Sequence, residues 1–135
     1  MHTGIVHSID FEAQGVQSGF ISIPHSVDRS PYYQIRTPYF RKTGGDGASI
    51  VMMAGNHGDE YEGELQLARL IRRLRTTDIR GTVTILPTVN QAAVMAARRC
   101  SPLDGGNLNR AFPGYPPRGR SAGGAHAADS PFSRT

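Results

Sequence analysis

The hydrophobic pattern changes its period twice between residues 49 and 86. Residues 49–54 form a continuous apolar run that stops at Gly55, which is typical of a central strand buried on both faces. Four aliphatic residues then recur at the spacing i, i+3, i+4, i+7: Leu67, Leu70, Ile71 and Leu74. This stripe predicts a helix over about residues 59–75. Residues 82–86 are rich in β-branched side chains, so strand, helix and strand predict a βαβ unit with a parallel pair.

The charges along this segment agree with a helix. Four acidic residues crowd its expected start: Asp59, Glu60, Glu62 and Glu64. Four arginines crowd its expected end: Arg69, Arg72, Arg73 and Arg75. A helix dipole favours negative charge at the N-terminus and positive charge at the C-terminus. Charge order and hydrophobic period therefore predict the same element.

The segments on either side are shorter and less regular. Residues 20–23 end at a proline, and residues 32–40 are aromatic-rich between a proline and a glycine turn; we expect both to be peripheral strands. Asn90 is of a type that caps helices, which predicts a short helix over residues 91–98. Residues 101–113 are mostly turn formers, so we expect a loop there.

The composition changes at Gly114. The final 22 residues contain no Val, Ile, Leu or Met, and such a segment cannot add to a hydrophobic core. We therefore predict three parts: a β-rich lead-in over residues 1–48, part of an α/β domain over residues 49–113, and a disordered tail over residues 114–135. The tail suggests a truncation or an out-of-frame end.

Composition narrows the class of protein. A chain of 135 residues is about one domain, and its single cysteine, Cys100, excludes an internal disulfide. No apolar run approaches the ~20 residues that cross a bilayer, so we expect no membrane partner and a cytoplasmic location. The net charge of +4 comes almost wholly from arginine, which raises the question of nucleic acid. Helix-end and tail arginines explain this charge, and we expect no nucleic-acid partner.

Residues 55–60 combine two glycines with potential metal ligands. They connect the end of the expected strand to the start of the expected helix, and α/β folds place their sites at the carboxyl ends of parallel strands. His57 offers an imidazole and Glu60 offers a carboxylate three residues later, and both are ordinary zinc ligands. The pattern alone also fits a solvated histidine beside an acid that complements the helix dipole.

Three ordered segments carry a family resemblance: GNHGDEYEG, PTVNQAA and SPLDGGNLNRAFPG. Together they resemble the succinylglutamate desuccinylase/aspartoacylase family, relatives of zinc carboxypeptidases, from about residue 8 to residue 114. Within that family, the lead-in IDFEAQGVQSGFISIPHSVDRS is most similar to the N-acetyl-diaminobutyrate deacetylases of ectoine breakdown. The resemblance implies a carboxypeptidase-like parallel or mixed sheet with flanking helices, present here only in part.

The same resemblance assigns roles to individual residues. It implies that His57 and Glu60 are two of three zinc ligands. It implies that Asn109 and Arg110 clamp a substrate carboxylate, for which a guanidinium and an amide are suited. Arg99 would face the scissile carbonyl and stabilise developing negative charge, although neighbouring Arg98 is an alternative. The family takes its third ligand, a histidine, and its catalytic glutamate from segments after the Asn-Arg motif, and neither is recognisable here.

Other candidates have simpler explanations. Cys100 lies beside two arginines, but no histidine or asparagine motif accompanies it as a nucleophile's partner. Asp104 precedes a glycine, as in many turns. His126 has the residue type of a third zinc ligand, yet it lies in a segment without an expected strand or helix to hold it.

We therefore expect a zinc-dependent amidohydrolase, with Zn²⁺ as cofactor, that removes an acetyl or similar acyl group from an N-acylated amino acid such as N-acetyl-diaminobutyrate. We expect this chain to be a truncated and weakly active or inactive form. The alternative is a metal-independent α/β binding module, or subunit fragment, that binds a partner or an anion. The sequence leaves the acyl group, the amine and homo-oligomerisation open.

Overall fold

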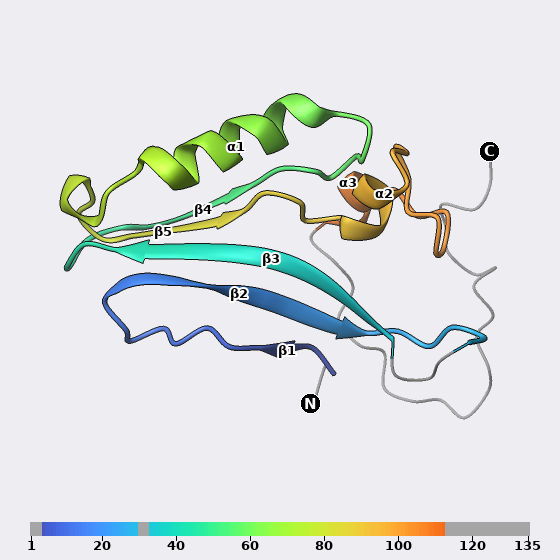
Figure 1. The fold of residues 1–135 in the computed structure, drawn as a ribbon, viewed down its shortest axis with the longest axis horizontal. Helices are drawn as coiled ribbons and strands as arrows, with labels where there is room; N and C mark the ends of the chain where they lie inside the picture. The colour runs from blue at the N-terminus through green and yellow to red at the C-terminus, as the bar shows by residue number, and fades with distance from the viewer. Residues whose placement is uncertain (1–3, 30–32, 113–135) are drawn as a thin grey trace.

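The computed structural model describes residues 4–29 and 33–112. Predictions for the tail and for His126 lie outside these residues. The strands are β1 (Val6–His7), β2 (Gly15–Pro24), β3 (Gln34–Thr43), β4 (Ser49–Met53) and β5 (Thr82–Leu86). The helices are α1 (Tyr61–Arg73), α2 (Gln91–Met95) and α3 (Leu108–Ala111), with a 3₁₀ turn, η1 (Thr76–Asp78), after α1. Figure 1 shows these elements around one sheet.

The five strands lie in the order β1-β2-β3-β5-β4. β4 pairs with β5 in parallel, while the other neighbours are antiparallel. The helix α1 connects the parallel pair, which confirms the predicted βαβ unit. The mixed sheet with flanking helices confirms the expected α/β fold. The lead-in strands belong to the same sheet, and the domain boundaries expected near residues 48 and 113 stay predictions.

The expected ranking of central and peripheral strands was wrong for the described residues. β3 lies in the middle of the sheet because it pairs with β2 along its whole length and with β5 on its other side. β4 has β5 as its only described neighbour. An apolar run indicates that a strand has apolar side chains on both faces, but it does not predict how many strands pair with it.

Two helices differ from the prediction: α2 ends early, and α3 was not expected. Asn90 caps α2 as predicted, with its side chain accepting the backbone N–H of Ala93. The helix ends earlier than expected because Ala97 has a positive φ of 50°. The expected loop over residues 101–113 contains the one-turn helix α3, which the side chain of Asn107 caps. A four-residue helix is too short for a periodic sequence pattern to reveal it.

Buried side chains lie on both faces of the sheet. Tyr39 of β3 and Ile85 of β5 are the largest fully buried ones, and Leu67 is the buried residue of α1. The Tyr39 hydroxyl lies 3.0 Å from Oγ of Ser8 in the lead-in, on the face of β3 opposite to Lys42. The Nζ of Lys42 donates to the carbonyl oxygens of Ile71 and Leu74, both at 2.6 Å. These carbonyls lack partners within the helix, so Lys42 ties the end of α1 to the sheet. No helix among the described residues is long and apolar enough to cross a bilayer.

Candidate metal and substrate site

The segment after β4 leaves the sheet along a fixed path. Ala54 donates its N–H to Leu86, and its carbonyl accepts from Val89, at 3.0 and 2.8 Å. Gly55 has a φ of 69°, which favours glycine, and its carbonyl accepts from Asn90. These bonds place residues 55–60 beyond the carboxyl ends of the parallel strands, where the sequence predicted the site.

Gly58 brings this segment into direct contact with α2. Its N–H donates to the carbonyl oxygen of Arg98 at 2.8 Å. A Cβ atom at this position would lie 2.0 Å from the carbonyl group of Ala93, so only glycine fits without a shift of backbone. The same close packing buries His57, whose exposed fraction is 4%.

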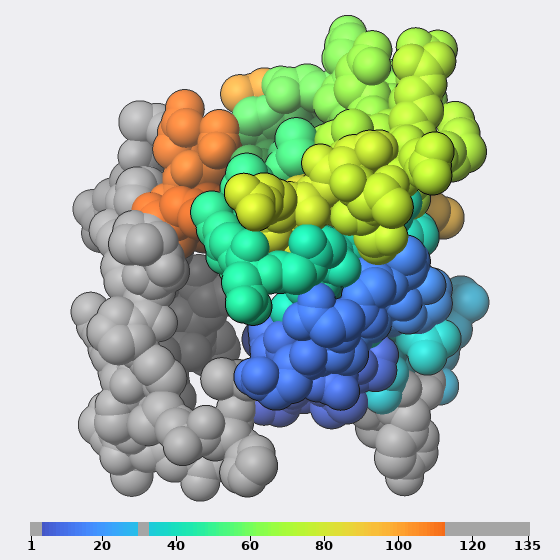
Figure 2. All heavy atoms as spheres, turned by 90° about the vertical axis from the view of Figure 1, so that its left-hand side faces the viewer, coloured from blue at the N-terminus to red at the C-terminus, as the bar shows by residue number. Residues whose placement is uncertain are grey.

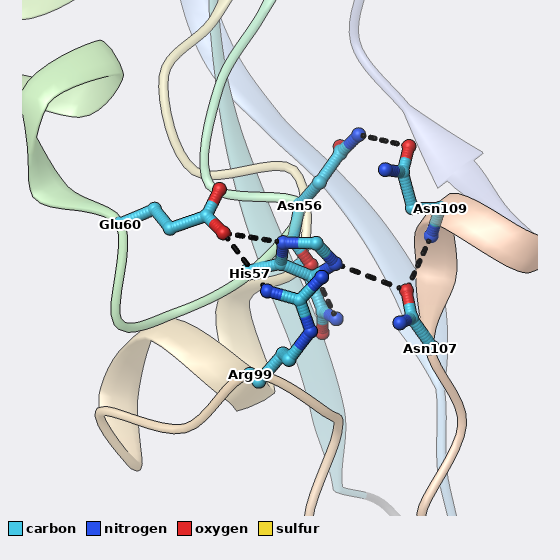
Figure 3. A network of polar contacts seen from close by, with 7 residues as sticks. Asn56, His57, Glu60, Arg99, Asn107 and Asn109 are labelled. Carbon is cyan, nitrogen blue, oxygen red and sulfur yellow. Dashed lines mark hydrogen bonds and ion pairs between the residues drawn. The ribbon is translucent and has the colours of Figure 1, made fainter.

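His57, Glu60 and Arg99 form one chain of polar contacts (Figure 3). Nδ1 of His57 lies 2.8 Å from Oε1 of Glu60. The guanidinium of Arg99 donates to the same carboxylate oxygen at 3.0 Å. The hydrogen bond with His57 lowers the pKa of Glu60, and the positive charge of Arg99 acts in the same direction. Glu60 is therefore a carboxylate ion at neutral pH, and it is more than half exposed.

Three asparagines lie on the other side of the His57 ring, and one of them contacts it. Oδ1 of Asn107 lies 3.1 Å from Nε2 of His57 and also accepts the backbone N–H of Asn109 at 3.0 Å. The side-chain amide of Asn56 donates to Oδ1 of Asn109 at 3.4 Å. Residues 56 and 107–109 lie far apart in the sequence, and Figure 3 shows them meeting around the imidazole.

This arrangement fixes the proton on the His57 ring. The Asn109 N–H needs an acceptor, so the Asn107 amide turns its oxygen toward the ring. An amide oxygen only accepts, so Nε2 of His57 carries a proton and donates it. Nδ1 then faces a carboxylate oxygen, and either a second proton or a cation must lie between these two atoms. Asn107 thus leaves Nδ1 as the ring atom available to a metal.

The donor atoms present fit zinc in kind. An imidazole nitrogen and a carboxylate oxygen converge within 2.8 Å, and both are common zinc ligands. Zinc sites use at least three protein ligands. The described part of the chain contains no cluster of three His, Cys, Asp or Glu residues that could hold a metal ion. His57 and Glu60 therefore fit two positions of such a site.

The other predicted site residues differ in whether they contact this pair or its polar network. Arg99 reaches Glu60, whereas Arg98 contributes its backbone carbonyl to Gly58 and makes no ion pair within the described ranges. Asn109 belongs to the polar network. Arg110 lies next to it on α3, is exposed, and forms no ion pair with any described residue.

Sequence reasoning missed Asn107 and Asn56 as site residues. Asn107 had a recognisable signal, because Asn often precedes a helix as its cap, and a cap has a fixed side-chain direction. Asn56 had no comparable signal. Asp104 has the turn role that its sequence suggested, since its carboxylate accepts the N–H of Gly106 at 2.8 Å.

Glu64 carries a buried carboxylate oxygen beneath the site. Its Oε1 has no hydrogen-bond partner among the described residues, and burial raises the pKa of this carboxyl group above its ordinary value of 4.5. A carboxyl whose pKa is raised on folding contributes stability that is fully present below pH 4.5 and is lost as the pH rises through the folded value.

We therefore expect Glu64→Gln to stabilise the chain at neutral pH and to flatten the fall of its stability as the pH rises above 4.5. The amide keeps the shape of the side chain without the cost of burying a charge. Urea unfolding across this pH range would measure the effect. Glu62→Gln, at an exposed position of the same helix, is the matched control for removing one negative charge from α1. A curve for Glu64→Gln parallel to that of the original chain would contradict this interpretation.

Comparison with known proteins supports the expected lineage. A sequence profile of the succinylglutamate desuccinylase/aspartoacylase catalytic domain matches residues 46–130. The N-alpha-acetyl-L-2,4-diaminobutyric acid deacetylase of Halomonas elongata is 49% identical over 109 residues, which are 81% of this chain and 32% of that protein.

Two solved structures share the fold. The succinylglutamate desuccinylase/aspartoacylase of Rhodobacter sphaeroides is 38% identical with a TM-score of 0.80. The product-bound ectoine utilization protein EutE of Ruegeria pomeroyi is 37% identical, also with a TM-score of 0.80. Each comparison covers 85% of this chain and 35% of the solved one, so the chain spans about a third of the length of its relatives. By its sequence and its fold, the chain belongs to the succinylglutamate desuccinylase/aspartoacylase family.

Proposed function

We propose that this chain carries part of the active site of a zinc-dependent deacylase that acts on N-acylated amino acids. The observation that carries the proposal is the arrangement around His57: its Nδ1 and the Glu60 carboxylate converge, while Asn107 holds the other ring nitrogen. The name of the Halomonas elongata relative specifies an acetylated diaminobutyric acid. N-acetyl-2,4-diaminobutyrate is therefore the substrate to test first.

The residues divide the work of such a reaction between them. His57 and Glu60 would hold the metal. A bound zinc ion polarises a carbonyl and lowers the pKa of a bound water. Arg99 already lies within 3.0 Å of Glu60, so its guanidinium can stabilise negative charge that develops on an acyl oxygen beside the metal ligands.

Residues of the neighbouring helix α3 would orient the substrate. Asn109 and Arg110 are successive residues on this helix, and Asn109 is tied to the network around His57 through Asn56. The guanidinium of Arg110 is exposed and makes no ion pair with the described residues. It is therefore free to bind a carboxylate in a bidentate manner.

We expect the purified chain to hydrolyse N-acetyl-2,4-diaminobutyrate slowly or not at all. A third zinc ligand and a general base are both needed for efficient hydrolysis, and the described residues contain no group of three potential ligands. An assay beside the Halomonas elongata deacetylase should give a rate lower by about 10²- to 10⁴-fold, the usual contribution of general acid–base catalysis. Equal rates would contradict the expectation of a weakly active chain.

Asn107 provides a second test of the metal site. Asn107→Ser keeps a hydroxyl that can cap α3 but is one bond too short to reach Nε2 of His57, whereas Asn107→Asp keeps both contacts. We expect zinc affinity, measured by calorimetry, to fall about 10- to 100-fold in Asn107→Ser and not to fall in Asn107→Asp.

The metal-free chain gives an independent measure of the same role. Proton NMR should show a slowly exchanging Nε2–H of His57 in the original chain and in Asn107→Asp, because that proton is buried and donated to the residue 107 side chain. The signal should be lost in Asn107→Ser. Equal zinc affinity and equal proton exchange in both variants would show that Asn107 only caps the helix.

A further inference from the structure

Three successive backbone carbonyls lead into the candidate site, and the segment before α2 holds each of them. The carbonyl of Ala54 accepts the N–H of Val89 at 2.8 Å. That of Gly55 accepts the backbone N–H of Asn90 at 3.0 Å. The carbonyl of Asn56 accepts from Nδ2 of the Asn90 side chain at 3.2 Å. A side-chain amide therefore extends the backbone contacts of this segment by one residue.

Asn90 supplies this last bond from its side chain because the helix α2 begins at the next residue. From there the backbone turns, and its N–H groups align with the helix axis. The side-chain oxygen of Asn90 accepts the N–H of Ala93 at 3.3 Å, which leaves its NH2 group for the Asn56 carbonyl. Aspartate caps a helix equally well, but it has no proton to donate at neutral pH. The position therefore uses both the acceptor and the donor of an asparagine amide.

Both peptide units that flank the Cα atom of His57 are bonded to residues just before or just after α2. The unit before His57 contains the Asn56 carbonyl, which Asn90 holds. The unit after it contains the N–H of Gly58, which donates to the Arg98 carbonyl at 2.8 Å. A peptide unit is planar, so each bond restricts the rotation of one plane. Together the two bonds restrict the backbone dihedral angles at the residue from which the imidazole projects.

We propose that Asn90 is a positioning residue for the metal ligand His57, and the inference rests on the proposed zinc site. Its side-chain amide holds the peptide unit that precedes His57 and caps α2 at the same time. Without the bond to the Asn56 carbonyl, this unit can rotate and carry the imidazole with it. The ring would then lose its distances of 2.8 Å to the Glu60 carboxylate and 3.1 Å to Asn107. A metal ion needs ligand atoms that the surrounding structure holds in a fixed geometry.

Asn90→Asp separates the two roles of this side chain. The variant keeps the helix cap and the backbone N–H that the Gly55 carbonyl accepts, but it sets a carboxylate oxygen against the Asn56 carbonyl. We expect zinc affinity, measured by calorimetry on the full chain, to fall about tenfold, the lower end of the effect of losing an outer-shell partner. In the metal-free chain, the Nε2–H proton of His57 should shift in the NMR spectrum and exchange faster with water.

A control variant weakens the fold far from the site. β3 ends and β5 begins at the opposite end of the sheet, which faces the viewer in Figure 2. There the hydroxyl of Thr82 lies 3.1 Å from that of Thr43, whose side chain is buried. Thr82→Val removes this contact and leaves the Thr43 hydroxyl without its partner, so it lowers stability without touching α2. It should leave both the zinc affinity and the His57 proton signal unchanged.

Asn90→Ala completes the comparison because it removes the cap and the donor together. If Asn90 positions His57, both Asn90→Asp and Asn90→Ala change the His57 proton signal, although only Asn90→Ala loses the helix cap. If Asn90 only caps α2, the proton signal and the zinc affinity of Asn90→Asp match those of the original chain, and the proposal is overturned. An original chain that binds no zinc would contradict the proposed function, while the metal-free spectra would still decide the role of Asn90.

Discussion

Gly58→Ala should cost this chain about 3 kcal/mol of stability, the upper end of the usual cost of overpacking, and it should disturb the candidate metal site at the same time. The added methyl group would lie 2.0 Å from the backbone carbonyl of Ala93, and the backbone cannot move aside as a flexible side chain would. Either α2 shifts or residues 55–60 shift. The second movement also breaks the bond from Gly58 to the Arg98 carbonyl.

Gly63 provides a control for this prediction. It lies in α1, where a Cβ atom would be 3.1 Å from the Cβ atom of Ala54. Alanine also favours a helix interior over glycine by about 1 kcal/mol. Gly63→Ala should therefore change the free energy of unfolding in urea by less than about 1 kcal/mol. Similar unfolding curves for the two variants would show that α2 is not packed on Gly58 as described.

Zinc affinity should fall sharply in His57→Ala. Removal of a ligand costs more than loss of an outer-shell partner, for which 10- to 100-fold is typical, so we expect affinity to fall by more than about 100-fold. Glu60 is more than half exposed and would be left with Arg99 as its partner. Calorimetric titration of the metal-free chain with zinc measures this directly.

His7→Ala is the matched control for that experiment. His7 is exposed on β1, and its Nδ1 accepts only a local backbone N–H, that of Ile9, at 3.3 Å. Its substitution should leave zinc affinity unchanged. If His7→Ala and His57→Ala lower zinc affinity equally, the ion binds histidines nonspecifically, and the proposed ligand pair is wrong.

A local sequence pattern predicts some contacts of the candidate site and not others. His57 and Glu60 are three residues apart, so their meeting follows from one turn of chain after a strand. Arg99 also reaches this pair, but its position depends on the packing of α2 against Gly58. Asn107 contacts His57 across 50 positions of sequence. No spacing rule connects residues that far apart, because their contact depends on how the intervening elements pack.

The sequence by itself determined two kinds of element: those whose apolar residues repeat at a fixed period, and those whose apolar run ends at a glycine or a proline. It placed α1, the parallel strands β4 and β5, and the pair of His57 and Glu60 that follows β4. Only the tertiary structure decided that β3 lies between β2 and β5, that Gly58 must be glycine, and that Asn107 holds the His57 ring. The physical reason is the separation of the interacting residues in the sequence. Hydrophobic period and helix charge depend on near neighbours. Strand order, close packing and side-chain networks depend on groups that meet only when the whole sheet has formed.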